Sequence, residues 1–130
     1  MGNTGRVALG VIAGIVLWSL LWLGGNAVAV AAMPDLIASG ERVDHLGVLL
    51  GYLGWSMILS VLAGYVTAAL AGTAAMRAVW ILAFVLLAMG IFFETSSWDL
   101  TPTWYHVVFL ALLIPMTVLG GRTKVGGRAV

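Results

Sequence analysis

Long runs of residues without a charged side chain constrain the fold of this chain more than any other feature. Asp, Glu, Lys and Arg are absent from four stretches, which are residues 7–34, 45–76, 78–93 and 100–121. A helix that crosses a bilayer needs about 20 apolar residues, because each residue rises about 1.5 Å through a hydrocarbon core about 30 Å thick. Three of the stretches reach that length. The stretch 78–93 reaches it when the uncharged residues beyond Glu94 are included.

These stretches predict an all-α fold, because open strands would leave backbone groups unpaired in lipid. We expect one membrane domain, residues 1–130, folded as a four-transmembrane-helix bundle with helices at about 7–33, 45–72, 78–97 and 102–121. The composition agrees, since 62% of the residues are hydrophobic and 8% are charged, against about 25% charged residues in soluble domains. The absence of cysteine excludes disulfides, thiolate metal sites and dithiol redox chemistry.

The charged residues divide between the predicted loops and give an orientation. Five of the six basic residues lie at the amino terminus, in the second loop and in the carboxyl tail: Arg6, Arg77, Arg122, Lys124 and Arg128. The five acidic residues lie in or beside the first and third loops, with Arg42: Asp35, Glu41, Asp44, Glu94 and Asp99. Because cytoplasmic loops carry the excess of Lys and Arg, both termini are predicted to be cytoplasmic. We expect a multi-pass protein of the inner (plasma) membrane.

The first apolar run also imitates a secretory signal, because it ends in alternating alanines at Ala27, Ala29 and Ala31. The apolar core of a signal peptide has about 7 to 15 residues, and this run is far longer. We therefore expect the segment to be retained as the first helix.

Small residues recur at every fourth position of the second predicted helix and indicate a helix-packing ridge. Its members are Ser56, Ser60, Gly64, Ala68 and Gly72. Small side chains let two helix backbones approach closely in a membrane. We expect this ridge to pack against another helix, either within the chain or from a second copy. The pairs Gly10 with Gly14 and Gly47 with Gly51 have the same spacing.

Glu94 and His106 form the candidate polar pair of the chain. Glu94 lies 17 residues after Arg77, and His106 lies 16 residues before Arg122. At the helical rise these separations are about 25 and 24 Å, so the two side chains lie at matching depth on consecutive helices. Ionisable groups inside a membrane are costly unless they are paired, and they often mark functional sites. The pair is predicted either to join the two helices or to form a ligand or proton site.

The sequence lacks the residues that several known classes of membrane protein and enzyme require. The first apolar run lacks the carboxylate on which small four-helix multidrug transporters depend, and no protease motif, phosphate loop or nucleic-acid-binding pattern occurs. A haem between His45 and His106 is a weak alternative, because His45 lies 27 residues from Gly72. That separation is about 40 Å, which puts His45 outside the hydrocarbon core. We expect no catalytic residues, no metal and no cofactor.

Two segments carry a resemblance to a known group of proteins. Residues 63–72 read AGYVTAALAG, and residues 104–122 contain WYH, FLALLIP and LGGR in that order. They resemble a family of small uncharacterised bacterial four-helix integral membrane proteins with a glycine-rich second helix. Members often carry a histidine near the end of the first helix, where this chain has Gly24, Gly25 and Asn26. The resemblance implies the four-helix fold and no known activity.

Two functions remain open. The first is a non-enzymatic small subunit or scaffold, whose ridge packs against a membrane-protein partner or a second copy in the bilayer. The second is a minimal oligomeric transporter or permease, with Asn26, Glu94 and His106 around a polar pocket that opens outward. The first is preferred, because a transporter needs a polar path and buried polar residues are scarce. No nucleic-acid partner is expected.

Overall fold

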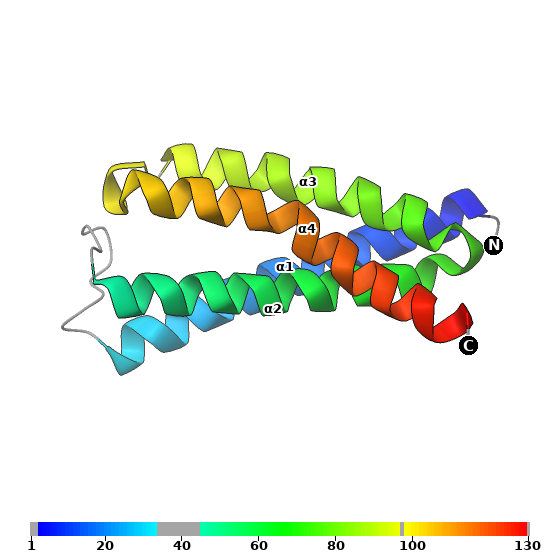
Figure 1. Ribbon diagram of the computed structural model, residues 1–130, viewed down its shortest axis with the longest axis horizontal. Coiled ribbons are helices and arrows are strands. Elements are labelled where there is room, and N and C mark those ends of the chain that lie inside the picture. The colour runs from blue at the N-terminus through cyan, green and yellow to red at the C-terminus, as the bar shows by residue number, and fades with distance from the viewer. Residues whose placement is uncertain (1–2, 34–44, 97, 130) are drawn as a thin grey trace.

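The computed structural model describes residues 3–33, 45–96 and 98–129, and every regular element in these ranges is a helix. The long helices are α1 (Asn3–Ala32), α2 (Leu46–Ala71), α3 (Ala75–Ser96) and α4 (Thr103–Ala129). Two short 3₁₀ helices connect them, η1 (Gly72–Ala74) and η2 (Trp98–Leu100). Figure 1 shows an elongated bundle in which the start of α1, the turn from α2 to α3 and the end of α4 lie at one end. The all-helical prediction is confirmed.

Three continuous helical stretches are long and apolar enough to cross a membrane. They are Thr4–Ala32, Leu46–Ser96 and Thr103–Gly126, and the second has 51 residues because it contains α2, η1 and α3. Such stretches support the prediction of a multi-pass membrane protein. The number of crossings and the side on which the termini lie remain predictions.

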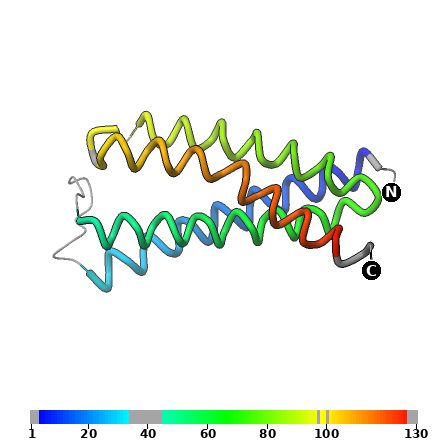
Figure 2. Tube along the Cα trace, in the orientation of Figure 1, coloured from blue at the N-terminus to red at the C-terminus, as the bar shows by residue number. Residues whose placement is uncertain are grey.

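Gly72 allows the chain to turn between α2 and α3. Its φ is +64°, a conformation that glycine adopts readily and that side chains with a Cβ disfavour. The helical path therefore continues through η1 into α3 but changes direction, and α3 lies alongside the rest of the bundle (Figure 2).

The observed helix bounds differ from the expected ones mainly at α4. This helix continues to Ala129, whereas the apolar pattern predicts an end near residue 121. Membrane length limits only the apolar part of a helix, and the backbone hydrogen bonds can continue into the polar tail. Pro115 lies inside α4 and does not end it.

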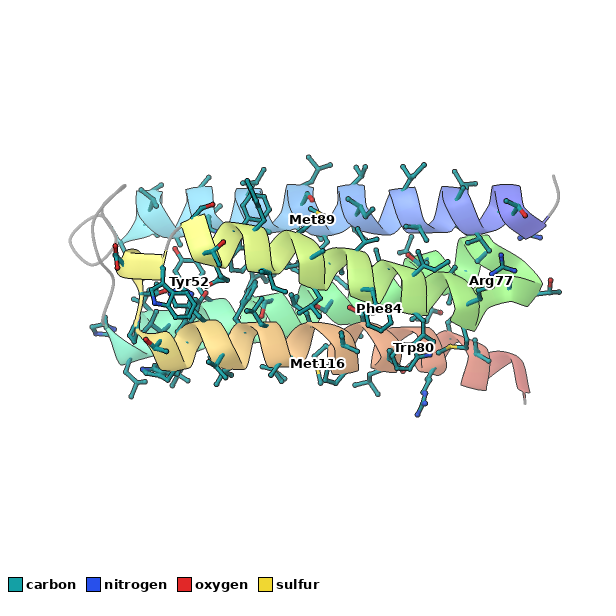
Figure 3. All side chains as sticks on the ribbon, turned by 90° about the horizontal axis from the view of Figure 1, so that it is seen from above. Tyr52, Arg77, Trp80, Phe84, Met89 and Met116 are labelled. Carbon is teal, nitrogen blue, oxygen red and sulfur yellow. The ribbon has the colours of Figure 1, made fainter. Side chains whose placement is uncertain are left out.

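The core contains large aliphatic and aromatic side chains from all four long helices. Trp18 of α1 stacks on Trp22, and both rings contact Phe109 of α4. The leucines that are almost fully buried in the same cluster are Leu49, Leu59, Leu82, Leu86 and Leu113. Figure 3 shows Tyr52 near one end of the bundle and Arg77 near the other.

Glycines bring α2 and α4 together. A Cβ built on Gly64 of α2 would lie 2.0 Å from the carbonyl oxygen of Thr117, and one built on Gly120 of α4 would lie 1.9 Å from that of Val61. Both distances are too short for any side chain. The two backbones therefore touch directly, as membrane helices do at small residues.

Candidate functional site

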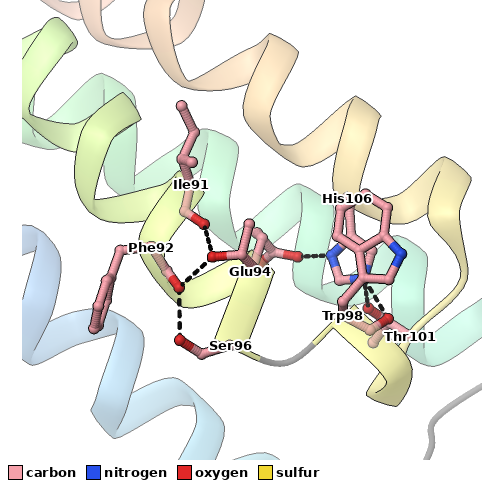
Figure 4. A network of polar contacts seen from close by, with 8 residues as sticks. Ile91, Phe92, Glu94, Ser96, Trp98, Thr101 and His106 are labelled. Carbon is pink, nitrogen blue, oxygen red and sulfur yellow. Dashed lines mark hydrogen bonds and ion pairs between the residues drawn. The ribbon is translucent and has the colours of Figure 1, made fainter.

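Glu94 and His106, which the sequence predicts to lie at one depth, contact each other in the structure. His106 Nδ1 meets Glu94 Oε2 across the interface of α3 and α4 (Figure 4). His106 Nε2 lies 2.9 Å from the carbonyl oxygen of Trp98 and 3.0 Å from Oγ1 of Thr101. The Trp98 ring covers the imidazole, with the ring centroids 4.3 Å apart and 10° between the planes. Three segments, the end of α3, η2 and the start of α4, therefore meet on one imidazole.

The hydrogen-bond partners determine where the protons of this cluster lie. A carbonyl oxygen only accepts, so Nε2 must carry a hydrogen that it donates to the carbonyl oxygen of Trp98. The Thr101 hydroxyl oxygen lies within hydrogen-bond distance of the same nitrogen. One further proton then lies between Nδ1 and Glu94. The pair has no net charge whichever atom holds that proton, which lowers its cost in an apolar surrounding.

The cluster is closed to external ligands. His106 has no exposed surface, Glu94 is buried, and both ring nitrogens are engaged by protein atoms. A ligand or metal could reach the imidazole only if one of these contacts broke. The geometry therefore favours a structural role, in which the pair holds α3, η2 and α4 together. This is one of the two interpretations left open by the sequence.

Asn26 does not join this cluster. Its side-chain amide donates to the carbonyl oxygen of Trp22, one turn earlier in α1, at 2.8 Å. The hydrogen bonds described for Glu94 and His106 involve α3, η2, α4 and Thr101, which lies between η2 and α4. Among the described residues, Asn26 therefore shares no hydrogen bond with the Glu94–His106 cluster, and the transporter hypothesis stays a prediction.

His45 begins α2 as its N-cap. Its Nδ1 accepts a hydrogen bond from the backbone N–H of Val48 at 3.3 Å, which satisfies one of the donors left unpaired at a helix start. Because His106 already uses both ring nitrogens, the structure gives no support to a haem held between these two histidines.

The small-residue ridge is covered within the chain. Ser56, Ser60 and Ala68 are almost fully buried. Trp18 Nε1 of α1 donates to Ser60 Oγ at 3.2 Å, and Thr117 of α4 covers Gly64. Gly72, the last member, forms the turn into α3. The ridge therefore packs α2 against α1 and α4, which is the first of the two alternatives that the sequence left open.

A groove between α1 and α2 was missed by the sequence analysis. It has a volume of about 660 Å³ and lies toward the end of α1 and the start of α2. Its walls are formed by Leu21, Gly24, Gly25, Val28, Ala29 and Met33 of α1 and by Val48, Gly51, Tyr52 and Trp55 of α2, with His45 and Gly47 at the α2 start. The fourfold spacing of Gly47 and Gly51 is the sequence feature that could have indicated this groove, but spacing alone does not say which surface the two glycines face.

Comparisons with protein-family models, with curated proteins and with solved structures gave no match. The resemblance to small bacterial four-helix membrane proteins therefore stays a prediction.

Proposed function

We propose that this chain is a non-enzymatic small subunit of a larger membrane assembly, and that it binds an apolar transmembrane helix of another protein in the groove between α1 and α2. In this proposal the chain crosses the inner membrane four times with both termini in the cytoplasm, as the distribution of basic residues indicates. The groove is the observation that carries the proposal, because the ridge is already occupied.

Two glycines of the groove support this choice when they are compared with glycines at the internal helix contacts. A Cβ added at Gly10, Gly14 or Gly64 would lie within 3.0 Å of another helix, so internal packing explains these residues. A Cβ added at Gly24 or Gly51, in the groove, would meet nothing within 4 Å. Glycine inside a helix costs about 1 kcal/mol relative to alanine. Close approach of a backbone from outside the chain would explain why glycine stands at Gly24 and Gly51.

The chemistry of the walls defines the partner. None of the residues that line the groove carries a carboxylate, ammonium or guanidinium group. The indole N–H of Trp55 donates to the carbonyl oxygen of Leu21 at 3.1 Å, so this polar group is already satisfied. From His45 to Trp55 the groove follows α2 for about 15 Å, or about three turns. An apolar helix with small residues at the contact fits these walls better than a polar solute does.

Photocrosslinking in native membranes tests the proposal. The chain has no cysteine, so Val28→Cys provides a unique attachment point for a benzophenone at the groove. Phe92→Cys on α3 is the matched control, because the two side chains are 68% and 67% exposed. We expect a discrete protein adduct from position 28 alone. Adding Gly51→Leu, which fills the groove, should abolish that adduct while the fold is retained.

The adduct must contain a protein with a membrane-spanning helix, identified by mass spectrometry, with the crosslinked peptide inside that helix. Equal adducts from positions 28 and 92 would show that both positions face the same surroundings and would refute the proposal. Lipid adducts alone at position 28 would make the groove an acyl-chain site and would also refute it.

A further inference from the structure

A second pocket lies at the opposite end of the bundle, beside the turn between α2 and α3. Its volume is about 500 Å³, and its walls are Arg6 of α1, Gly72, Thr73, Ala75 and Met76 around the turn, and Val125 of α4. Unlike the groove, this pocket contains a permanently charged group, the guanidinium of Arg6. Its chemistry therefore points to a different ligand.

The fold holds Arg6 at the wall of this pocket. Its Nε donates to the carbonyl oxygen of Leu70 in the last turn of α2 at 3.2 Å, where the helix dipole favours a cation. A Cβ built on Gly72 would lie 2.8 Å from Cζ and from Nη1 of Arg6, so the guanidinium lies against the glycine. The four remaining N–H donors of the side chain belong to Nη1 and Nη2. These atoms lie beside Gly72, which is itself a wall of the pocket.

Charge at this end of the bundle attracts anions. Arg77 lies in the first turn of α3 and is labelled in Figure 3, and Arg122 and Lys124 belong to the last turns of α4. Figure 1 shows that these two helix ends lie at the same end of the bundle as the start of α1, which carries Arg6. Glu94 and Asp99, the acidic residues in the described ranges, belong to the end of α3 and to η2, at the far end. The pocket therefore combines a fixed guanidinium with a positive surrounding.

We propose that this pocket binds the phosphate group of an anionic phospholipid from the cytoplasmic leaflet. Arg6 would hold the phosphate through its paired Nη donors, the geometry in which arginine binds phosphate oxygens. The apolar walls, Ala75, Met76 and Val125, would contact the glycerol and the first methylene groups, which a free phosphate ion lacks. Basic pockets between membrane helices on the cytoplasmic side bind anionic headgroups in this way. This proposal does not depend on the groove.

Lipid titration of the purified full chain in detergent tests the proposal. Phosphatidylglycerol, phosphatidylcholine and inorganic phosphate are added in separate arms, and bound lipid is counted by native mass spectrometry. We expect phosphatidylglycerol to bind and the other two ligands to bind far more weakly. Arg6→Gln removes two charge-assisted hydrogen bonds and should weaken phosphatidylglycerol binding on the order of 100-fold.

Arg77→Gln is the matched control, because it removes one positive charge at the same end of the bundle from a residue that does not line the pocket. Arg77→Gln should weaken phosphatidylglycerol binding about fivefold at low salt, because it reduces the general attraction of anions. This effect should vanish at high salt. Arg6→Lys keeps the charge but not the paired donors, and should lose about tenfold. This milder variant decides the question if Arg6→Gln fails to fold.

Three results would overturn the assignment. If phosphatidylcholine bound as tightly as phosphatidylglycerol, the pocket would not select a headgroup with a net negative charge. A loss in Arg77→Gln as large as that in Arg6→Gln would mean a diffuse attraction rather than a site. Inorganic phosphate that binds as tightly as the lipid would make this a site for free phosphate.

Discussion

Gly64→Ala adds one methyl group where the backbones of α2 and α4 touch. The new Cβ would lie 2.0 Å from the carbonyl oxygen of Thr117 and 3.1 Å from the nitrogen of Gly121. The obstacle is backbone, so no side chain can rotate away, and the helices must separate by about 1 Å to restore a tolerable distance. A gap of about 1 Å forfeits up to about half of the dispersion energy of each contact that it opens.

The expected cost is about 3 kcal/mol, the upper end of what overpacking usually costs. The better helix propensity of alanine offsets about 1 kcal/mol, so the free energy of unfolding should fall by about 2 kcal/mol. Gly51→Ala in the same helix is the control, because its Cβ would meet nothing within 4 Å. That variant should be neutral or more stable by up to about 1 kcal/mol.

Reversible unfolding in mixed micelles of increasing SDS content, followed by tryptophan fluorescence, measures both free energies. The two variants carry the same chemical change in the same helix, so the difference between their free energies of unfolding, about 2 to 3 kcal/mol, reports the contact with the neighbouring helix. If Gly64→Ala were as stable as Gly51→Ala, the contact between α2 and α4 described here would be wrong.

In the same assay Glu94→Gln and His106→Gln should each cost about 2 kcal/mol or more, with the larger loss for His106 because it also contacts Trp98 and Thr101. The double variant should lose less than the two singles combined, and strictly additive losses would contradict a direct contact. Thr4→Cys and Thr123→Cys should resist an impermeant thiol reagent added to intact cells, whereas Ser39→Cys, outside the described residues, should react. Labelling at position 4 or 123 would exclude cytoplasmic termini.

The sequence predicts those features that depend on position along a helix axis. Because each residue adds a fixed rise, counting from Arg77 and Arg122 gave Glu94 and His106 the same depth, and the structure brings them into contact. The positions of the four long helices follow in the same way from the lengths of the apolar stretches. The polar tail of α4 lies beyond this rule, so its continuation to Ala129 could not be predicted.

Features that depend on rotation about the axis could not be predicted. The fourfold spacing marks one face of α2, but an internal helix and an external helix select the same small residues. The sequence therefore could not say that Trp18 and Thr117 cover the ridge. The same limit applies to Asn26, because depth alone did not show that its amide bonds back to Trp22 and remains outside the Glu94–His106 cluster.

The hydrogen bonds of the polar groups inside the bundle support the two proposals, which place ligands at its surfaces. Trp18 bonds to Ser60, Thr67 bonds to the Gly10 carbonyl, and Glu94 bonds to His106. In the described part of the chain, no buried side-chain nitrogen or oxygen lacks a hydrogen-bond partner. Polar groups that already join helices to one another cannot also line a path for a solute without breaking the fold, because an unpaired group in lipid costs several kcal/mol. The proposed partners are therefore placed where the packing of the described residues is open, at the α1–α2 groove and at the basic end around Arg6.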